Sequence, residues 1–224
     1  DSPELNIVLP QKQQDLYCLK IHPANGLLRS NDFAYLVESV QYYKTVEARL
    51  GFQSDLYIRN LTLEQANVIA EDLKAVLQQS KVEQSVSCIG LPKCPNGKAR
   101  SQELRYKIVE YLNQKQISYH HLPRICISGC ENGCTRHHIS HIGFEGKTIT
   151  YNNQSCEAYD VYIGGKVGSK TSCGKFYGIM LASQIPEFVY QLALILQDAE
   201  MDFPVYYHSN TAEFDAFIKP FLFA

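Results

Sequence analysis

The sequence lacks long apolar runs and an excess of charge of either sign. Its 224 residues carry 21 Lys and Arg against 23 Asp and Glu, which gives a formal net charge of −2. That balance disfavours a strongly basic nucleic-acid-binding protein. No stretch approaches the ~18 apolar residues that a membrane span needs, and none near the start has the features of a secretory signal. We therefore expect a cytoplasmic protein with no membrane span and no nucleic-acid partner.

Cysteine, by contrast, is frequent. The chain has eight cysteines, many for a cytosolic domain of this size, and its 45% of hydrophobic residues is ordinary for a globular protein. Without a secretory signal, clustered cysteines bind metals or act in catalysis more often than they form disulfides. The chain begins with Asp1 instead of Met, which fits a processed or excised piece of a longer protein.

The pattern of apolar residues predicts a mixed α and β protein in two parts, with a boundary near residues 80–87. Residues 1–14 are polar and indicate an irregular N-terminal arm. Residues 15–80 follow the order strand, helix, strand, helix. The predicted elements are a strand over 16–21, a helix from Ser30 or Asn31 to Gly51, a strand over 55–59, and a helix that begins with a capping box at Thr62 and Gln65.

The second part, residues 81–224, combines helices with short strands. Pro95 favours the first turn of a helix whose apolar face holds Leu104, Ile108 and Leu112. The other predicted elements are a buried strand over 124–128, short strands over 142–144, 148–151 and 159–163, and helices over 186–198 and 211–219.

Four cysteines stand in two closely spaced pairs. Cys88 and Cys94 have the spacing C-x5-C, and Cys130 and Cys134 have the spacing C-x3-C. Glycines within and beside the pairs allow the backbone to bend so that the thiolates converge. Four thiolates can hold an iron–sulfur cube. Zinc is a second interpretation, although C-x5-C is wide for a zinc pair, and four buried inert cysteines are a third.

The surrounding segments resemble a known family. Residues 86–94 (VSCIGLPKC) resemble the first cluster motif of the siroheme and 4Fe-4S sulfite and nitrite reductase hemoproteins, and residues 128–134 (SGCENGC) resemble the second, T/S-G-C-P-N-x-C. Residues 142–146 (IGFEG) and 159–168 (YDVYIGGKVG) are similar to two later motifs in the same order. The resemblance implies an α+β fold, with a ferredoxin-like half domain over 15–80 and an α/β siroheme and 4Fe-4S-binding domain over 81–224.

The resemblance also implies the cofactors and their ligands. The four paired cysteines would bind a 4Fe-4S cluster, and Cys134 would also bridge to the iron of siroheme. Siroheme carries eight carboxylates, which call for cationic and backbone donors. The implied cofactor-binding residues are Asn60, Asn132, Arg136, Gly164, Gly165 and Lys166, and Arg59 is the implied catalytic residue. The loop that holds Arg59 and Asn60 is shorter than is usual in the family.

Other positions depart from the family pattern. Glu131 replaces the usual proline, and its charge either lowers the cluster potential or faces solvent. Three histidines (His137, His138 and His141) follow the second pair; they are proton-delivery groups or, the interpretation that we favour, part of a face packed near the cofactor. The remaining cysteines match no ligand position, and we assign them to structure: Cys18, Cys126, Cys156 and Cys173.

Reductases of this family usually carry two such units in one chain, and this sequence holds one, with the cysteines. The cations that bind substrate come largely from the other unit. We therefore expect a homodimer or a second reductase half unit. The implied substrate is a small anion, sulfite or nitrite, and the implied electron donor is a protein such as ferredoxin or a flavoprotein.

The leading hypothesis is thus a six-electron sulfite or nitrite reductase, an oxidoreductase. Three alternatives stay open. A precorrin-3B synthase-like protein shares the cysteine motifs, but residues 142–146 and 164–166 look more like the reductases. An electron-transfer or cofactor-binding subunit without its own substrate pocket fits the short loop at Arg59. A zinc-stabilised α/β domain is the last.

Overall fold

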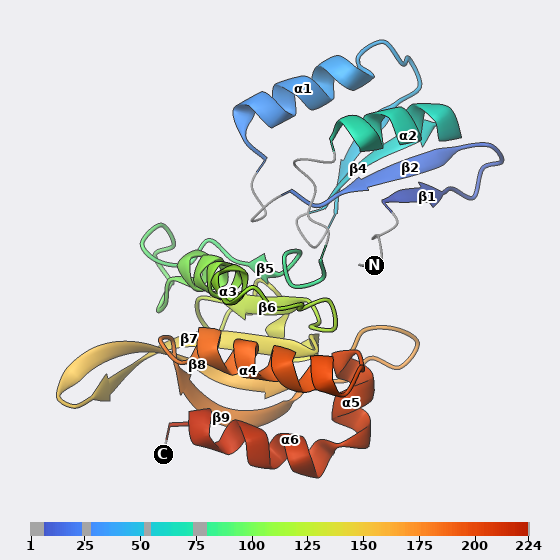
Figure 1. Cartoon of the computed structure of the whole chain (residues 1–224). Helices are drawn as coiled ribbons and strands as arrows, with labels where there is room; N and C mark the ends of the chain where they lie inside the picture. Colours follow the sequence, from blue (N-terminus) through green and yellow to red (C-terminus); the bar gives the residue numbers. More distant parts are fainter. Residues whose placement is uncertain (1–6, 24–27, 52–54, 74–79, 224) are drawn as a thin grey trace. The chain divides into compact units, whose positions relative to one another are not determined.

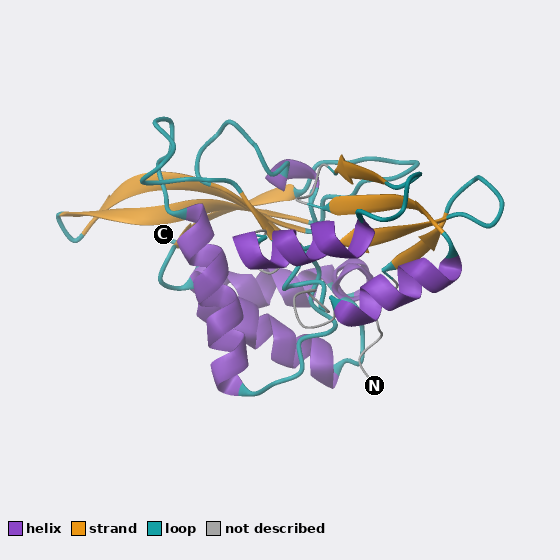
Figure 2. Cartoon of the chain, turned by 90° about the horizontal axis from the view of Figure 1, so that it is seen from above, coloured by secondary structure: helices purple, strands orange, loops and turns teal. Residues whose placement is uncertain are grey.

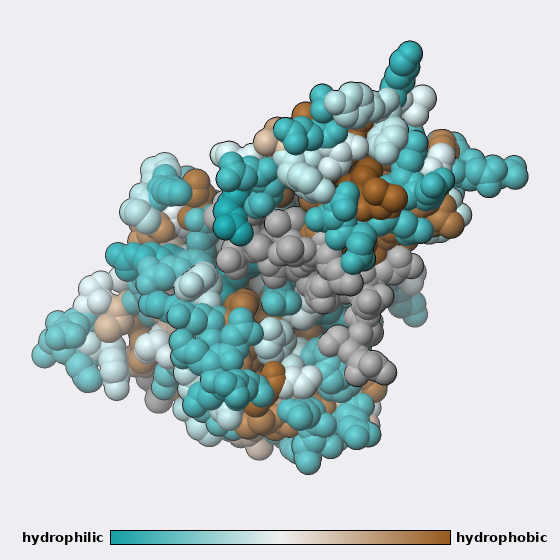
Figure 3. Space-filling model, turned by 45° about the horizontal axis from the view of Figure 1, so that its top comes forward, coloured by the Kyte–Doolittle hydropathy of each residue, from teal (hydrophilic) through white to brown (hydrophobic). Residues whose placement is uncertain are grey.

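The chain folds into two compact units, Asp1–Gln84 and Ser85–Ala224 (Figure 1). The computed structural model describes residues 7–23, 28–51, 55–73 and 80–223. In the view of Figure 3 the surface of each unit is mostly hydrophilic, with hydrophobic side chains in small patches. Within the described ranges, no helix combines the length and the apolar character that crossing a membrane requires.

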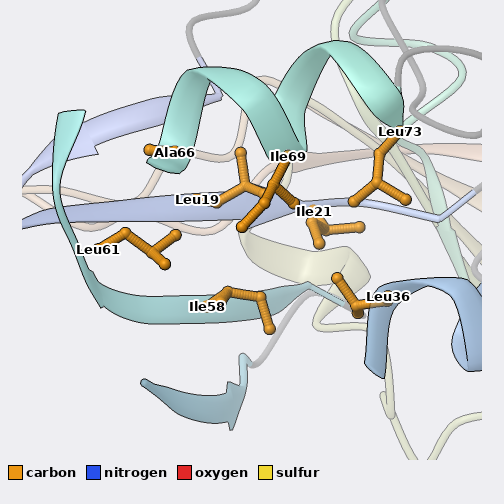
Figure 4. Packing of buried hydrophobic residues seen from close by; sticks show 8 residues of the cluster. All are labelled: Leu19, Ile21, Leu36, Ile58, Leu61, Ala66, Ile69 and Leu73. Carbon is orange, nitrogen blue, oxygen red and sulfur yellow. The ribbon is translucent and has the colours of Figure 1, made fainter. Parts of the chain in front are cut away.

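The described part of the first unit is an antiparallel sheet with two helices. The strands are β1 (Val8–Pro10), β2 (Tyr17–Ile21), β3 (Glu47–Leu50) and β4 (Leu56–Leu61), in the order β1-β2-β4-β3, and the helices are α1 (Ser30–Val40) and α2 (Leu63–Asp72). Their buried side chains form one core (Figure 4): Leu19, Ile21, Leu36, Ile58, Leu61, Ala66, Ile69 and Leu73. The capping box is confirmed, since Gln65 N–H donates to Thr62 Oγ1 and Thr62 N–H donates to Gln65 Oε1.

Two expectations for this unit are wrong. The irregular arm contains β1, because apolar Val8 and Leu9 pair with β2 and Pro10 is tolerated on an edge strand. The helix expected from Ser30 to Gly51 ends at Val40, and β3 follows it. Of the apolar stripe that suggested a longer helix, Leu36 is buried, Val40 and Val46 pack half-buried against the core, and Phe33 and Val37 are exposed. Residues 74–79, which include part of the predicted stripe of the second helix, lie outside the described residues.

The second unit is built on a mixed sheet in the order β5-β6-β7-β8-β9. Its strands are β5 (Val86–Ser87), β6 (Ile125–Ser128), β7 (Ile142–Tyr151), β8 (Gln154–Ile163) and β9 (Lys175–Leu181). The first two pairings, β5 with β6 and β6 with β7, are parallel, and the last two are antiparallel. All four residues of β6 are buried, as predicted for that segment.

The helices of this unit lie mainly on one face of the long strands (Figure 2). They are α3 (Ser101–Lys115), η2 (His137–Ile139), α4 (Ile185–Asp198), α5 (Phe203–Ser209), α6 (Thr211–Ile218) and η3 (Lys219–Phe221). Helix α4 buries Phe188, Leu192 and Leu196, which recur at every fourth position on one face. The predicted helices over 186–198 and 211–219 are confirmed.

Other expectations for this unit need correction. The segments 142–144 and 148–151 are one strand, β7, because the hairpin with β8 pairs every residue from Ile142 to Tyr151. Helix α3 begins at Ser101, so Pro95 lies in a turn before it and not in its first turn. Strand β9 and helix α5 were not predicted.

Candidate metal centre

Two adjacent parallel strands bring the cysteine pairs to one edge of the sheet. Cys88 follows β5, and Cys130 comes two residues after β6. Ser87 lies opposite Ile127 in the register, so the two strands end at nearly the same level. Because parallel strands point the same way, the loops after them leave from the same edge. The topology therefore places the first residue of each pair on neighbouring loops.

Direct hydrogen bonds join these two loops. The N–H of Gly129 donates to Cys88 Sγ at 3.0 Å, and the N–H of Cys88 donates to the carbonyl of Ile127 at 3.1 Å. The carbonyl of Gly129 accepts from the N–H groups of Lys98 and Ala99 at 2.8 and 3.1 Å. The two cysteine segments thus form one hydrogen-bonded structure.

Close backbone contact explains two of the glycines. A Cβ on Gly129 would lie 2.9 Å from the carbonyl oxygen of Ala99 and 3.0 Å from Cα of Gly90. Gly90 itself has φ of +53°, and its Cβ would lie 2.8 Å from the same carbonyl. Real Cβ atoms do not approach backbone so closely, so both positions require glycine.

The four thiols differ in exposure. Cys130 is buried, Cys88 and Cys94 are half-buried, and Cys134 is exposed; all four are free thiols. The N–H of Cys94 donates to the carbonyl of Gly90 at 2.8 Å, which closes the turn between the first two cysteines. Four free thiols on two joined loops are a soft donor set that fits a 4Fe-4S cluster. The exposed thiol of Cys134 is open to a further group.

The negative charge of Glu131 is paired with the positive charge of Lys98. Its carboxylate lies 2.6 Å from Nζ of Lys98, and both side chains are about half exposed. The hydrogen bond with Lys98 lowers the pKa of the Glu131 carboxyl and raises the pKa of the Lys98 ammonium. The extra negative charge beside Cys130 therefore has a cation next to it.

The next two predicted residues lie on either side of Cys134, Asn132 within the second cysteine pair and Arg136 just after it. Both are exposed. Arg136 has φ of +60°, and its N–H donates to the carbonyl of Gly133 at 2.7 Å. Asn132, Cys134 and Arg136 are thus all exposed within five consecutive residues.

The histidines after this turn differ from one another. His137 is fully buried, with Nδ1 2.9 Å from Ser128 Oγ and Nε2 2.9 Å from Glu145 Oε2. Burial, together with neighbouring His138, lowers the pKa of the His137 imidazole. His137 therefore belongs to a packed polar network next to β6 and β7, in line with the structural interpretation. The sequence reasoning did not identify Ser128 or Glu145 as its partners, although both lie in the quoted motifs.

The glycine pair of the last motif contacts protein atoms. A Cβ on Gly165 would lie 2.5 Å from the carbonyl oxygen of Ser140, and a Cβ on Gly164 would lie 2.4 Å from the ring of Tyr207. These contacts with protein atoms explain why glycine is needed at both positions, whether or not a ligand binds there. Lys166 is exposed at the base of a loop closed by reciprocal backbone hydrogen bonds with Ser172 at 3.0 and 3.1 Å. The cofactor-binding roles of these three residues stay predictions.

Arg59 and Asn60 belong to the first unit and lie inside β4, not in a loop after it. Arg59 lies 3.6 Å from Glu47. Asn60 has φ of +64°, its N–H donates to Gln11 Oε1 at 2.8 Å, and its side chain donates to the carbonyl of Thr45 at 3.0 Å. The expectation of a strand-end loop is therefore wrong, because the strand continues to Leu61. Their roles in catalysis and cofactor binding stay predictions.

The other four cysteines lie apart from the paired segments in the chain. Cys18 and Cys126 are buried on β2 and β6, and burial raises the pKa of both thiols. Cys156 is half-buried on β8, and Cys173 is exposed just before β9. Cys126 lies opposite Val86 in the β5–β6 register, so it is close in the fold to the start of both paired segments.

A cavity of about 720 Å³ adjoins the first cysteine loop within the second unit; Leu91 and Lys98 are part of its lining. Its charged groups are paired, Lys98 with Glu131 outside the lining and the others with one another. Arg100 forms an ion pair with Glu157, and Lys107 lies 2.7 Å from Glu103. The cavity therefore presents mixed and mutually compensated charge.

Comparison with known proteins identifies the family. Residues 78–197 match the family described as the nitrite and sulphite reductase 4Fe-4S domain. The chain is 27% identical over 176 residues to a chloroplastic ferredoxin–nitrite reductase of Spinacia oleracea, covering 76% of this chain and 30% of that protein. It is 30% identical over 150 residues to a sulfite reductase [NADPH] hemoprotein beta-component of Anoxybacillus flavithermus, covering 59% and 24%. The chain thus spans about a third or less of the length of these relatives.

Solved structures share the fold. The Mycobacterium tuberculosis NirA protein aligns with a TM-score of 0.67 at 20% identity, covering 84% of this chain and 36% of that one. A dissimilatory sulfite reductase I aligns with a TM-score of 0.62 at 10% identity, covering 93% and 70%. These similarities confirm the predicted α+β fold of the sulfite and nitrite reductase type. Together with the family match over more than half of its residues, they show that the chain belongs to the nitrite and sulphite reductase 4Fe-4S domain family.

Proposed function

We propose that this chain is the cluster-binding part of a siroheme-dependent reductase of sulfite or nitrite. In this proposal Cys88, Cys94, Cys130 and Cys134 would hold a 4Fe-4S cluster, and Cys134 would also serve as a ligand for siroheme. The main support is the pair of loops at the ends of β5 and β6, where the N–H of Gly129 donates to Cys88 Sγ at 3.0 Å. When bound, the two cofactors supply the electron-transfer chemistry, and the protein supplies position and electrostatics.

The protein's own groups position Cys88. The N–H of Gly129 donates to Cys88 Sγ at 3.0 Å and orients the sulfur. Ser101 Oγ lies 3.3 Å from the same sulfur and donates to the carbonyl of Cys88 at 2.9 Å. The contacts from Gly129 and Ser101 hold the Cys88 side chain in place and supply hydrogen bonds to a sulfur that would ligate the cluster.

The exposed residues around Cys134 support a site for an anionic macrocycle. Carboxylates are best bound by Arg, by Lys and by backbone N–H groups. Asn132 and Arg136 flank the exposed thiol, and Lys166 presents an exposed cation on the loop after β8. We assign these residues, with Gly164, Gly165 and Asn60, to siroheme binding, and Arg59 to catalysis.

The activity of a whole reductase would need more than this chain. Because the chain spans about a third of its curated relatives, we propose that a second half unit or a second copy supplies the remaining cations for the substrate. The relatives' names point to ferredoxin or an NADPH-linked component as their electron source, and we propose a donor of that kind here. A cytoplasmic location is part of the same proposal.

One observation favours a second candidate, an electron-transfer or cofactor-binding subunit. Arg59 lies within β4 and close to Glu47, in place of the strand-end loop that the resemblance implied. A subunit without a substrate pocket would keep the four thiols and reduce nothing by itself.

Anaerobic reconstitution with iron, sulfide and siroheme tests the proposal. We expect four irons per chain from the cluster, visible absorption from both cofactors, and loss of cluster absorption in Cys88→Ser. Cys173→Ser, a change to an exposed cysteine outside the pairs, is the matched control. A chain that binds one zinc and no iron would overturn the proposal. Reduction of nitrite and of sulfite by a reduced viologen dye, with and without a partner half unit, separates enzyme from subunit.

A further inference from the structure

Two histidines and a glutamate come together in the second unit, next to the segment that carries Cys130 and Cys134 but with no cysteine among their donor atoms. His137 Nε2, His138 Nε2 and Glu145 Oε2 all lie within 4.8 Å of one another. The histidines come from η2 and the glutamate from β7. We propose that these three atoms form a binding site for a divalent first-row transition cation such as Zn²⁺, independent of the cluster and of siroheme.

The spacing of the three atoms suits such an ion. Zinc holds imidazole nitrogen and carboxylate oxygen at about 2.0–2.1 Å, so tetrahedral ligands lie roughly 3.3–3.4 Å apart. Glu145 Oε2 lies 2.9 Å from His137 Nε2 and 3.5 Å from His138 Nε2. The two carboxylate-to-imidazole distances thus differ from the tetrahedral value by a few tenths of an ångström, and the two imidazole nitrogens lie within 4.8 Å of each other.

Residues behind the three donor atoms fix the orientation of the imidazole rings. Ser128 Oγ lies 2.9 Å from His137 Nδ1, the ring nitrogen that faces away from Glu145. Such a contact fixes the tautomer and the orientation of a ligating imidazole. The ring of Tyr162 packs against both imidazoles, with centroids 4.5 Å from His138 and 5.4 Å from His137.

The backbone also fixes the two elements together. A Cβ on Gly143 would lie 2.0 Å from the carbonyl oxygen of His137, so η2 rests directly on β7. A site whose ligands come from two such tightly packed elements is preorganised.

Charge and exposure favour a cation there. Glu145 lies directly opposite Asp160 in the β7–β8 register, and opposed like charges are unfavourable. Lys147 pairs with Asp160 at 2.7 Å, which leaves the Glu145 carboxylate facing the two imidazoles. His137 is fully buried, and burial lowers the pKa of its imidazole, which favours the neutral form that binds a metal. The side chain of His138 is 43% exposed, so an ion reaches the site from solvent and keeps an open coordination position.

The donor set also selects the ion. Imidazole nitrogens suit zinc and other first-row transition ions, whereas Mg²⁺ requires oxygen ligands. We expect the chain to take up Zn²⁺ at this site and to exclude Mg²⁺.

Calorimetric titration of the anaerobically purified full chain with Zn²⁺, and separately with Mg²⁺, tests the site. His138→Gln removes a partly exposed ligand, and Glu145→Gln removes the anionic one while keeping its size. Each should weaken Zn²⁺ binding at this site by at least the roughly 10- to 100-fold that loss of a second-shell partner costs. His208→Gln changes an exposed histidine of the same unit outside the cluster and should leave binding unchanged.

Co²⁺ spectra separate this site from the cysteines. Metal bound to thiolates gives a strong sulfur-to-metal charge-transfer band in the ultraviolet, whereas a site of nitrogen and oxygen donors gives only weak visible bands. We expect His138→Gln to remove weak visible bands and to leave any charge-transfer band unchanged. Zn²⁺ isotherms and Co²⁺ spectra that are the same in the wild type and in both folded variants would overturn the proposal, as would equal uptake of Mg²⁺. Circular dichroism establishes that each variant is folded.

Discussion

The two units of this chain use different means to fix their structure. In the first, eight apolar side chains from two strands and two helices interlock, and polar residues such as Asn60 bond within the unit. In the second, the region around the cysteines is fixed by backbone contact, with Gly90 and Gly129 packed against the Ala99 carbonyl. Side-chain packing stabilises the first unit, whereas backbone contact fixes the positions of the cysteine loops in the second. We therefore expect changes in the first unit to alter its stability, and changes at the cysteine loops to alter the metal centre.

The largest expected effect tests the side-chain core. Leu61 is fully buried in the first unit, and Leu61→Ala should cost about 2–5 kcal/mol of that unit's free energy of unfolding through lost burial and a cavity. The iron content of the second unit should not change. Leu63→Ala, which truncates an exposed leucine two residues away, is the matched control. Denaturant unfolding measures the free energy of unfolding, and iron analysis measures the iron content. If Leu61→Ala lowered both, stability of the first unit and the metal centre of the second would not be separate properties.

The next effect tests backbone contact. Gly90→Ala places a Cβ against Ala99 at φ of +53°, which should cost about 1–3 kcal/mol from overpacking and about 1–2 kcal/mol from the left-handed conformation. Because the strain lies between Cys88 and Cys94, cluster incorporation should fall sharply. Lys93→Ala, in the same loop but exposed, should incorporate a normal cluster. Normal iron content in Gly90→Ala would show that the loop tolerates displacement.

A smaller effect is expected at the start of α2. Thr62→Ala removes one side of the capping box, which should destabilise the first unit by about 1 kcal/mol. Gln65→Ala removes the other side, and the double variant should cost less than the sum, because the two bonds are reciprocal. Glu64→Ala, an exposed change in the same turn, is the control. Additive losses would mean that the two hydrogen bonds act separately.

The segments that the sequence predicted correctly are those whose structure depends on neighbouring residues in the chain. The capping box, the buried strand β6 and the cysteine loops carry their signal in local residues, and all three segments are found where the residues indicated. Strand β3 was missed because its alternation of polar and apolar residues (EARL) covers only four residues, all of them exposed. The helix before it was extended because Val46, which packs on the core from the segment between α1 and β3, also fits a helical spacing from Leu36 and Val40.

Contacts between side chains on different elements could not be predicted from neighbouring residues in the sequence. The contact between His137 and Glu145 depends on how η2 packs on β7, and the ion pair between Lys98 and Glu131 joins two different loops. Sequence spacing gives no information on either. Tertiary packing alone defines these contacts.

The smallest expected effect concerns the ion pair between Lys98 and Glu131, beside Cys130. It tests whether side chains or backbone control the charge next to the cysteine loops. The folded protein holds the pKa of Glu131 below its usual value, chiefly through the hydrogen bond from Lys98. The resulting stabilisation is therefore complete above the ordinary carboxyl pKa and is lost as the pH falls through the lowered one. Lys98→Ala should raise the Glu131 pKa toward its ordinary value, and added salt should do so in part, because both groups are exposed and screened. An NMR titration of the Glu131 carboxyl measures the shift, with Lys93→Ala as control. If the pKa of Glu131 were the same in Lys98→Ala, the backbone around Cys130 would be its cause, and charge at this edge would be fixed by the same backbone that positions the thiols.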